Sequence, residues 1–272
     1  EEDLLRRDLT VNAIAESREG DLIDPYGGQA DLQARVLRHV SPAFIEDPLR
    51  VLRVARFAAY LHHLGFSVAE ETLALMRTLS DSGELATLSA ERLWSELARA
   101  LQTPHPEEFF RVLESCGATR ALLPELDLET ALECLHKATV QHTQPEIRFA
   151  ALCSRLGEQS VESLCQRLNA PRRFSELAAH WAALEQALAQ PTQLAPSDQL
   201  QVLERSDAFR RPERFEQLLE TLAALHPEAD TDFWRSALAA CQAVDAAAIA
   251  ATGIPGHEIG ARLRAEREKL LG

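Results

Sequence analysis

Four charged residues recur at every third position of an otherwise apolar stretch: Asp47, Arg50, Arg53 and Arg56. On a helix this spacing forms a stripe that slants around the axis. Each guanidinium needs an anionic or hydrogen-bonding partner, and only Glu46 and Asp47 lie nearby in the sequence to supply one. A structural ion-pair network is one interpretation. Binding of an anionic ligand such as a nucleotide is the interpretation that we favour.

The same stripe could also read a nucleobase. A carboxylate accepts a hydrogen bond from an exocyclic amine, and an arginine donates to ring nitrogens or carbonyl oxygens. Cytosine and adenine both present an amine beside a ring acceptor, whereas uracil and guanine place a carbonyl where the amine would be. Asp47 and Arg50 together could therefore accept C and A while rejecting U and G.

Two further clusters carry polar residues in close succession. Residues 6–13 read Arg-Arg-Asp-Leu-Thr-Val-Asn-Ala, which can bind phosphate and sugar oxygens through charge-assisted hydrogen bonds. From residue types alone, the simpler interpretation is a solvated helix start whose Asp8 complements the helix dipole. Residues 89–97 place Arg92 and Glu96 four positions apart behind a possible N-cap, Ser89. Taken alone, this third cluster is an ordinary amphipathic helix.

The elements that must position these residues are mostly helical. Residues 1–40 suggest a fragment of an α/β layer, with short helices near 10–15 and 29–35 and strands near 20–24 and 36–40. From Ser41 onward we find only helical signals, interrupted by proline and glycine. The first of these helices is expected to run from Ile45 to Leu64 and to stop at Gly65. The sequence therefore predicts a mainly α protein.

Composition sets limits on the class of protein. The chain has 272 residues, 46% of them hydrophobic, so it can bury a sizeable core. Its five cysteines form no CxxC pair, which favours reduced thiols and a cytoplasmic location, and no apolar run suggests a membrane span. The net charge of −14 argues superficially against a nucleic-acid partner, but a local basic stripe can serve an acidic protein.

Several segments, in fixed order, resemble the class II tRNA nucleotidyltransferase and poly(A) polymerase family. They are residues 6–13, 23–28, 37–40, 46–58 and 89–92. Their order and spacing resemble most closely the bacterial branch that adds CCA to tRNA. The resemblance is strong over the first hundred residues and weak afterwards. Residues 256–263 are similar to the tail helix of the family.

This resemblance implies a helical neck, body and tail preceded by a short α/β remnant of the nucleotidyltransferase head. Residues 1–40 would end the head, 41–104 would form the neck, 105–195 the body and 196–272 a tRNA-binding tail. The implied reaction adds C, C and A to the tRNA 3′ end from CTP and ATP, without a nucleic-acid template.

The resemblance also implies roles for single residues in nucleotide binding. Arg7 would contact the incoming nucleotide, and Asp8 and Asn12 would shape the same pocket. Asp47 and Arg50 would act as the protein template that reads C and A. The two remaining arginines of the stripe would support the base-reading pair and the triphosphate; these are Arg53 and Arg56.

Two departures from the family pattern limit what this chain is expected to do alone. The paired aspartates that hold Mg²⁺ belong upstream of Arg6, so we expect no catalytic or metal-binding residue within the chain and no activity of it alone. Some bacterial relatives also carry an HD metal-dependent site after an Arg-Phe-Ala segment. Here Arg148-Phe149-Ala150 is followed by Cys153 and Ser154 in place of the His-Asp pair, which predicts that this site is lost.

Two other functions remain as alternatives. A poly(A) polymerase or an A-adding enzyme would share the neck motifs, although poly(A) polymerases typically carry a long basic extension, whereas residues 264–269 have mixed charge. A non-catalytic helical RNA-binding module is the alternative of another class. The sequence indicates no membrane partner and does not reveal an oligomeric state.

Overall fold

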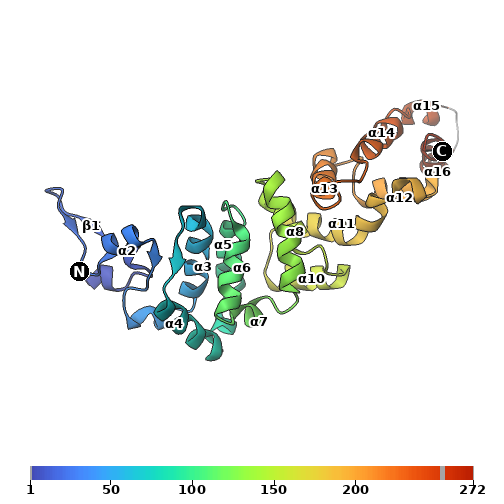
Figure 1. The fold of residues 1–272 in the computed structure, drawn as a ribbon. Coiled ribbons are helices and arrows are strands. Elements are labelled where there is room, and N and C mark those ends of the chain that lie inside the picture. The colour runs from blue at the N-terminus through green and yellow to red at the C-terminus, as the bar shows by residue number, and fades with distance from the viewer. Residues whose placement is uncertain (1, 252–254, 272) are drawn as a thin grey trace.

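The computed structural model describes residues 2–251 and 255–271, and it is mainly helical as predicted. Residues 252–254 and 272 of the expected tail lie outside the described residues. In Figure 1 the helices follow one another along an elongated, curved body with the two ends of the chain far apart. The candidate site residues belong to the first third of this body.

The N-terminal layer is a small α/β arrangement with very short strands. The β1 and β2 strands pair antiparallel, and β3 pairs in parallel with β4 (Ser67–Val68), which comes later in the chain. Asp24 caps the second helix by accepting from the backbone N–H groups of Gly28 (2.7 Å) and Gln29 (2.8 Å). The elements are α1 (Glu2–Leu5), η1 (Thr10–Asn12), β1 (Ala15–Glu16), β2 (Leu22–Ile23), α2 (Gly28–Ala34) and β3 (Val36–Leu37).

The next segment carries the predicted stripe, and here the expected start of the long helix is wrong. The helix α3 (Leu49–Leu61) begins four residues later than Ile45, after the short 3-10 turn η2 (Pro42–Glu46). Pro48 disfavours helical backbone at the residue before it, and Asp47 is accordingly extended at φ −134° and ψ 105°. The end is as predicted, because Gly65 adopts φ +80° after η3 (His62–Leu64). Asp47 therefore lies outside the helix that carries the arginines.

The strand β4 (Ser67–Val68) then leads into α4 (Glu70–Asp81), η4 (Glu84–Thr87) and α5 (Ala90–Ala100). The α3 helix packs against both α5 and α6 (Pro106–Ser115). Ser89 caps α5 by accepting from the backbone N–H of Arg92. This packing brings the third sequence cluster alongside the stripe.

The remaining helices form the rest of the curved body. Among the described residues, four of the α-helices from α6 onward and the 3-10 helix η5 start with proline. The remaining helices are α7 (Ala118–Leu122), α8 (Leu128–Gln141), α9 (Pro145–Leu152), α10 (Glu158–Arg167), α11 (Arg172–Ala189), η5 (Pro191–Gln193), α12 (Pro196–Arg205), α13 (Pro212–Leu225), α14 (Thr231–Gln242), α15 (Ala246–Ala250) and α16 (Gly256–Lys269).

A buried arginine, Arg148, connects the segment that follows α5 with helices later in the chain. Arg148, on α9, donates from Nη1 to the carbonyls of Leu101 (2.7 Å) and Thr103 (2.9 Å). Its Nε donates to the carbonyl of His142 at 2.8 Å. Burial lowers the pKa of Arg148, and these carbonyls accept from three of its five N–H groups. One side chain thus connects the segment after α5 with the segment between α8 and α9.

Candidate nucleotide-binding site

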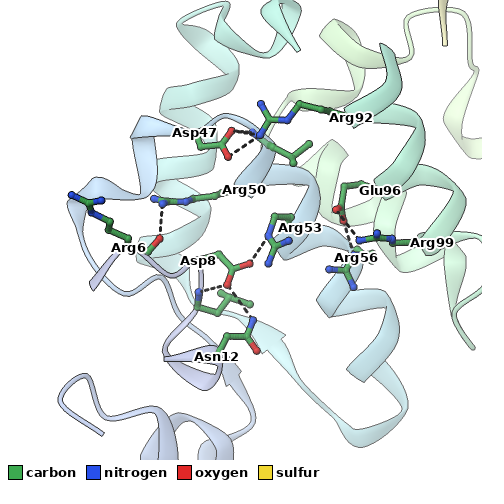
Figure 2. Close-up of polar contacts among 12 residues, drawn as sticks. Arg6, Asp8, Asn12, Asp47, Arg50, Arg53, Arg56, Arg92, Glu96 and Arg99 are labelled. Carbon is green, nitrogen blue, oxygen red and sulfur yellow. Dashed lines mark hydrogen bonds and ion pairs between the residues drawn. The ribbon is translucent and has the colours of Figure 1, made fainter. Parts of the chain in front are cut away.

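The first predicted cluster, residues 6–13, contains both buried and exposed charged side chains. Asp8 is buried, and its carboxylate accepts from the backbone N–H of Leu9 (2.9 Å), from Nδ2 of Asn12 (3.1 Å) and from Nε of Arg53 (2.7 Å). The structure thus brings Asp8, Asn12 and Arg53 together although 45 residues separate the two ion-pair partners. Figure 2 shows Asp8 between Arg53 and Asn12.

Arg7 forms its ion pair outside this group. Its side chain is half exposed and pairs with Asp3 at 2.8 Å, one helical turn earlier in the chain. The hydrogen bond and the charge of Asp3 raise the pKa of Arg7. Of the three residues predicted from the first cluster, the structure therefore places Asp8 and Asn12 together and leaves Arg7 on the surface.

Asp47 is held by a residue of α5. Both of its carboxylate oxygens accept from Nη2 of Arg92, each at 2.9 Å, and Oδ1 also accepts from the backbone N–H of Leu49 at 3.1 Å. The Asp47 side chain remains 37% exposed, so the carboxylate is accessible from solvent. Arg92 thereby fixes the orientation of the carboxylate that the sequence singles out as a base reader.

The side chain of Arg50 donates hydrogen bonds to backbone carbonyls and not to the carboxylate of Asp47. Its Nη1 donates to the carbonyl of Ala43, and its Nη2 donates to the carbonyl of Arg6 at 2.6 Å. The backbone N–H of Arg50 donates to the backbone carbonyl of Asp47 at 3.0 Å, but among the described residues no side-chain hydrogen bond or ion pair joins Arg50 to the Asp47 carboxylate. Neither Glu46 nor Asp47, the acids that lie nearby in the sequence, forms an ion pair with an arginine of the stripe within the part of the chain that the structure describes. Arg50 instead connects the first cluster to the start of α3, as Figure 2 shows.

Arg56 completes the stripe and pairs with a buried acid of α5. Its Nε lies 2.6 Å from Oε2 of Glu96, whose side chain is only 4% exposed. The second oxygen of Glu96 lies 3.7 Å from Nη1 of Arg99. The acids that neutralise the stripe are thus Asp8 and Glu96, each at least 40 residues away in sequence.

Sequence reasoning missed the contribution of α5 to this site. Arg92, Glu96 and Arg99 occupy positions i, i+4 and i+7 and therefore share one face of the helix. That periodicity was visible, but it is equally typical of a solvated helix. Only the packing of α3 against α5 reveals that this face meets the stripe.

Comparison with known proteins places this arrangement in a family. A family model described as "Poly A polymerase head domain" matches residues 1–38, and one described as "Probable RNA and SrmB- binding site of polymerase A" matches residues 65–129. A CCA-adding enzyme from Pseudomonas putida is 49% identical over 284 aligned residues, which cover 100% of this chain and 76% of that relative. This chain belongs to the CCA-adding family of tRNA nucleotidyltransferases.

Solved structures of CCA-adding enzymes share the fold. One determined as a complex with CTP has a TM-score of 0.73 at 22% identity, covering 99% of this chain and 68% of that one. The CCA-adding enzyme of Thermotoga maritima, complexed with tRNA, has a TM-score of 0.72 at 21% identity, covering 99% and 69%. At this identity the likeness concerns the fold alone.

CCA-adding and related nucleotidyltransferases use divalent metal ions. Within residues 2–251 and 255–271, no three His, Cys, Asp or Glu side chains are arranged so that they could hold such an ion. Cys153 and Ser154, which we expect in place of an HD pair, are both buried: burial raises the pKa of the Cys153 thiol, and Ser154 lies 3.5 Å from Glu185. Within the same ranges, no helix combines the length and apolar character needed to cross a bilayer.

Proposed function

We propose that this CCA-adding family member extends the 3′ end of tRNA with C, C and A from CTP and ATP, and that the stripe selects the nucleotide. The observation that carries this assignment is the carboxylate of Asp47, fixed by Arg92 yet accessible. A carboxylate offers about four acceptor positions. Leu49 and Arg92 use three of them, so Oδ2 retains one for the exocyclic amine of cytosine or adenine.

The other predicted residues surround this acceptor in the proposal. Arg50 lies next in the stripe and would donate to the ring acceptor of the base. Asp8 and Asn12 would act by holding Arg53, whose contact with Asp8 fixes it beside the first cluster. Arg53 and Arg56 would face the triphosphate, and the exposed Arg7 would approach the nucleotide from the surface.

We also propose the division into head, neck, body and tail that the sequence suggests, and a cytoplasmic location. Residues 1–40 would end the head, 41–104 would form the neck, 105–195 the body and 196–272 the tRNA-binding tail, in a cytoplasmic enzyme. Mg²⁺ would be the metal of nucleotidyl transfer, and its ligands are expected upstream of Arg6. The roles that we assign to the described residues are nucleotide binding and the choice of base.

The decisive experiment incubates the full-length protein with tRNA that ends at its discriminator base, together with CTP and ATP. Addition of C, C and A in that order is the expected result, read by sequencing the extended 3′ ends. Addition of A alone to this substrate would show an A-adding enzyme or a poly(A) polymerase instead. Absence of any product would favour a non-catalytic RNA-binding module.

A further inference from the structure

A further arginine, Arg99, lies beside the candidate site on α5. It shares the carboxylate of Glu96 with Arg56, so two guanidinium groups flank one acid, as Figure 2 shows. The two contacts are unequal, because Arg56 lies at 2.6 Å from Glu96 and Arg99 at 3.7 Å. Arg56 is thus tightly held, whereas Arg99 is loosely held.

The charge of this group faces outward. Two guanidinium groups and one carboxylate leave a net charge of +1, and the carboxylate is buried with 4% of its side chain exposed. The side chain of Arg99 is 60% exposed, so the uncompensated positive charge reaches solvent through it. In a chain with a net charge of −14, this local excess would attract an anion to the α5 side of the site.

A purely structural role would explain little about Arg99. The ion pair with Glu96 contributes little to folding stability, because its atoms are 3.7 Å apart and water and salt reach the exposed guanidinium of Arg99. Its contact with Glu96 is the one ion pair of its side chain within the described residues, so most of its five N–H donors remain available. Guanidinium donors match phosphate oxygens in both charge and geometry.

We propose that Arg99 and Arg56 form a two-arginine subsite for phosphate oxygens, with Glu96 as the residue that positions both. The inference rests on the proposed function and adds a binding residue that the sequence motifs do not contain. The phosphate belongs either to the triphosphate of the incoming nucleotide or to the backbone of the RNA strand being extended. Both present the same oxygens, and two measurements distinguish them.

The test uses the full-length protein with Arg99→Ala and Arg99→Lys. Affinity for tRNA is measured by fluorescence anisotropy over a series of salt concentrations, and the KM for CTP is measured at saturating tRNA. An RNA phosphate predicts about tenfold weaker tRNA binding by Arg99→Ala, with a salt dependence shallower by roughly 0.7–0.9 in log–log slope. A nucleotide phosphate predicts an increase of about tenfold in the KM for CTP, with unchanged tRNA affinity. Arg99→Lys keeps the charge and should recover part of the loss.

Arg111→Ala is the matched control. Arg111 is 56% exposed and pairs with Glu108 at 3.5 Å, three positions away on α6, so its removal deletes a comparable charge outside the site. Both constants should stay at the wild-type value. The inference is overturned if Arg99→Ala changes neither tRNA affinity, salt slope nor KM, or if Arg111→Ala changes them equally. A wild type that binds tRNA but adds no nucleotide would contradict the proposed function, while the binding measurement would still decide the role of Arg99.

Discussion

Asp47 lies in the chain between the 3-10 turn η2 and the helix α3, and its carboxylate is bound by a residue of α5. Pro48 keeps its backbone extended, Leu49 anchors one oxygen, and Arg92 reaches across from α5 to both oxygens. A carboxylate fixed in this way can distinguish an amine from a carbonyl, because a carbonyl oxygen in the same place would face another acceptor without a proton between them.

We therefore predict that Asp47→Ala weakens the choice of base in the full-length enzyme. Loss of one hydrogen bond to a charged group costs about 1.5–3 kcal/mol, which corresponds to roughly ten- to a hundredfold in discrimination. UTP and GTP should then compete better with CTP and ATP. The measurement is kcat/KM for all four nucleotides with wild type and variant.

Arg53→Ala supplies the contrasting variant for this prediction. It removes one of the three donors to the buried Asp8 and should raise the KM for all four nucleotides alike. An unchanged preference for C and A in Asp47→Ala would contradict the template role of the stripe. The arginines would then be interpreted as a structural ion-pair network.

At this scale the sequence singled out the charged residues of the candidate site but did not indicate their ion-pair partners. The three-residue spacing of the stripe was sufficient to single out Asp47, Arg50, Arg53 and Arg56. The acids that neutralise two of these arginines lie 45 and 40 residues away, where no local periodicity could indicate them. Long-range ion pairs depend on packing, which a single sequence does not reveal.

Among the elements, α5, α8 and α9 meet at Arg148. We predict that Arg148→Leu lowers the free energy of unfolding by about 3–5 kcal/mol, because two buried hydrogen bonds and one partly buried hydrogen bond to backbone carbonyls are lost at once. Urea denaturation followed by circular dichroism measures the change. Arg155→Leu, at an exposed position just after α9, should remain within about 0.5 kcal/mol of wild type. Equal stability of the two variants would show that Arg148 does not stabilise this junction.

The positions of the elements were largely predictable from proline and glycine. Prolines at the first helical positions and the left-handed Gly65 mark boundaries because each imposes its own backbone geometry. The start of α3 was mistaken because the apolar pattern continues upstream through Ile45. Pro48 prevents the helix from following that pattern, since the residue before a proline avoids helical backbone.

For the whole molecule, two partly buried histidines predict how stability depends on pH. Burial lowers the pKa of His39, with Arg38 adding to the effect. Burial likewise lowers the pKa of His180, where Arg205 and Arg211 lower it further and Asp207 raises it. In both cases the folded chain binds a proton less readily than the unfolded chain, whose histidines titrate near pH 6.5.

Protonation of these two histidines should therefore leave the free energy of unfolding unaffected above about pH 6.5 and should lower it as the pH falls below that value. Tm measured between about pH 5 and 7.5 should rise with pH, and carboxylates contribute mainly below this window. The double variant His39→Gln/His180→Gln should show a flatter profile. A wild-type Tm that is constant over this range would contradict the prediction.

The mainly α composition of the molecule was predictable, but its elongated shape was not. Helix propensity and periodicity depend on neighbouring residues, whereas the curvature in Figure 1 depends on how successive helices pack. Buried aromatic residues such as Trp94, Phe149 and Phe174 contact one another edge to face between α5, α9 and α11. Their presence predicts a core, but not the direction in which the core extends.

The division of the site between two helices also determines how its selectivity could be inherited. A recombination event that moved residues 46–56 into a related scaffold without residues 89–99 would separate Asp47 from Arg92 and Arg56 from Glu96. The transplanted segment would keep its motif but lose the orientation of its acceptor. Base preference should therefore be transferred between homologues only when residues 46–56 and 89–99 are exchanged together. A substitution in one of these segments then restricts which substitutions the other can accept.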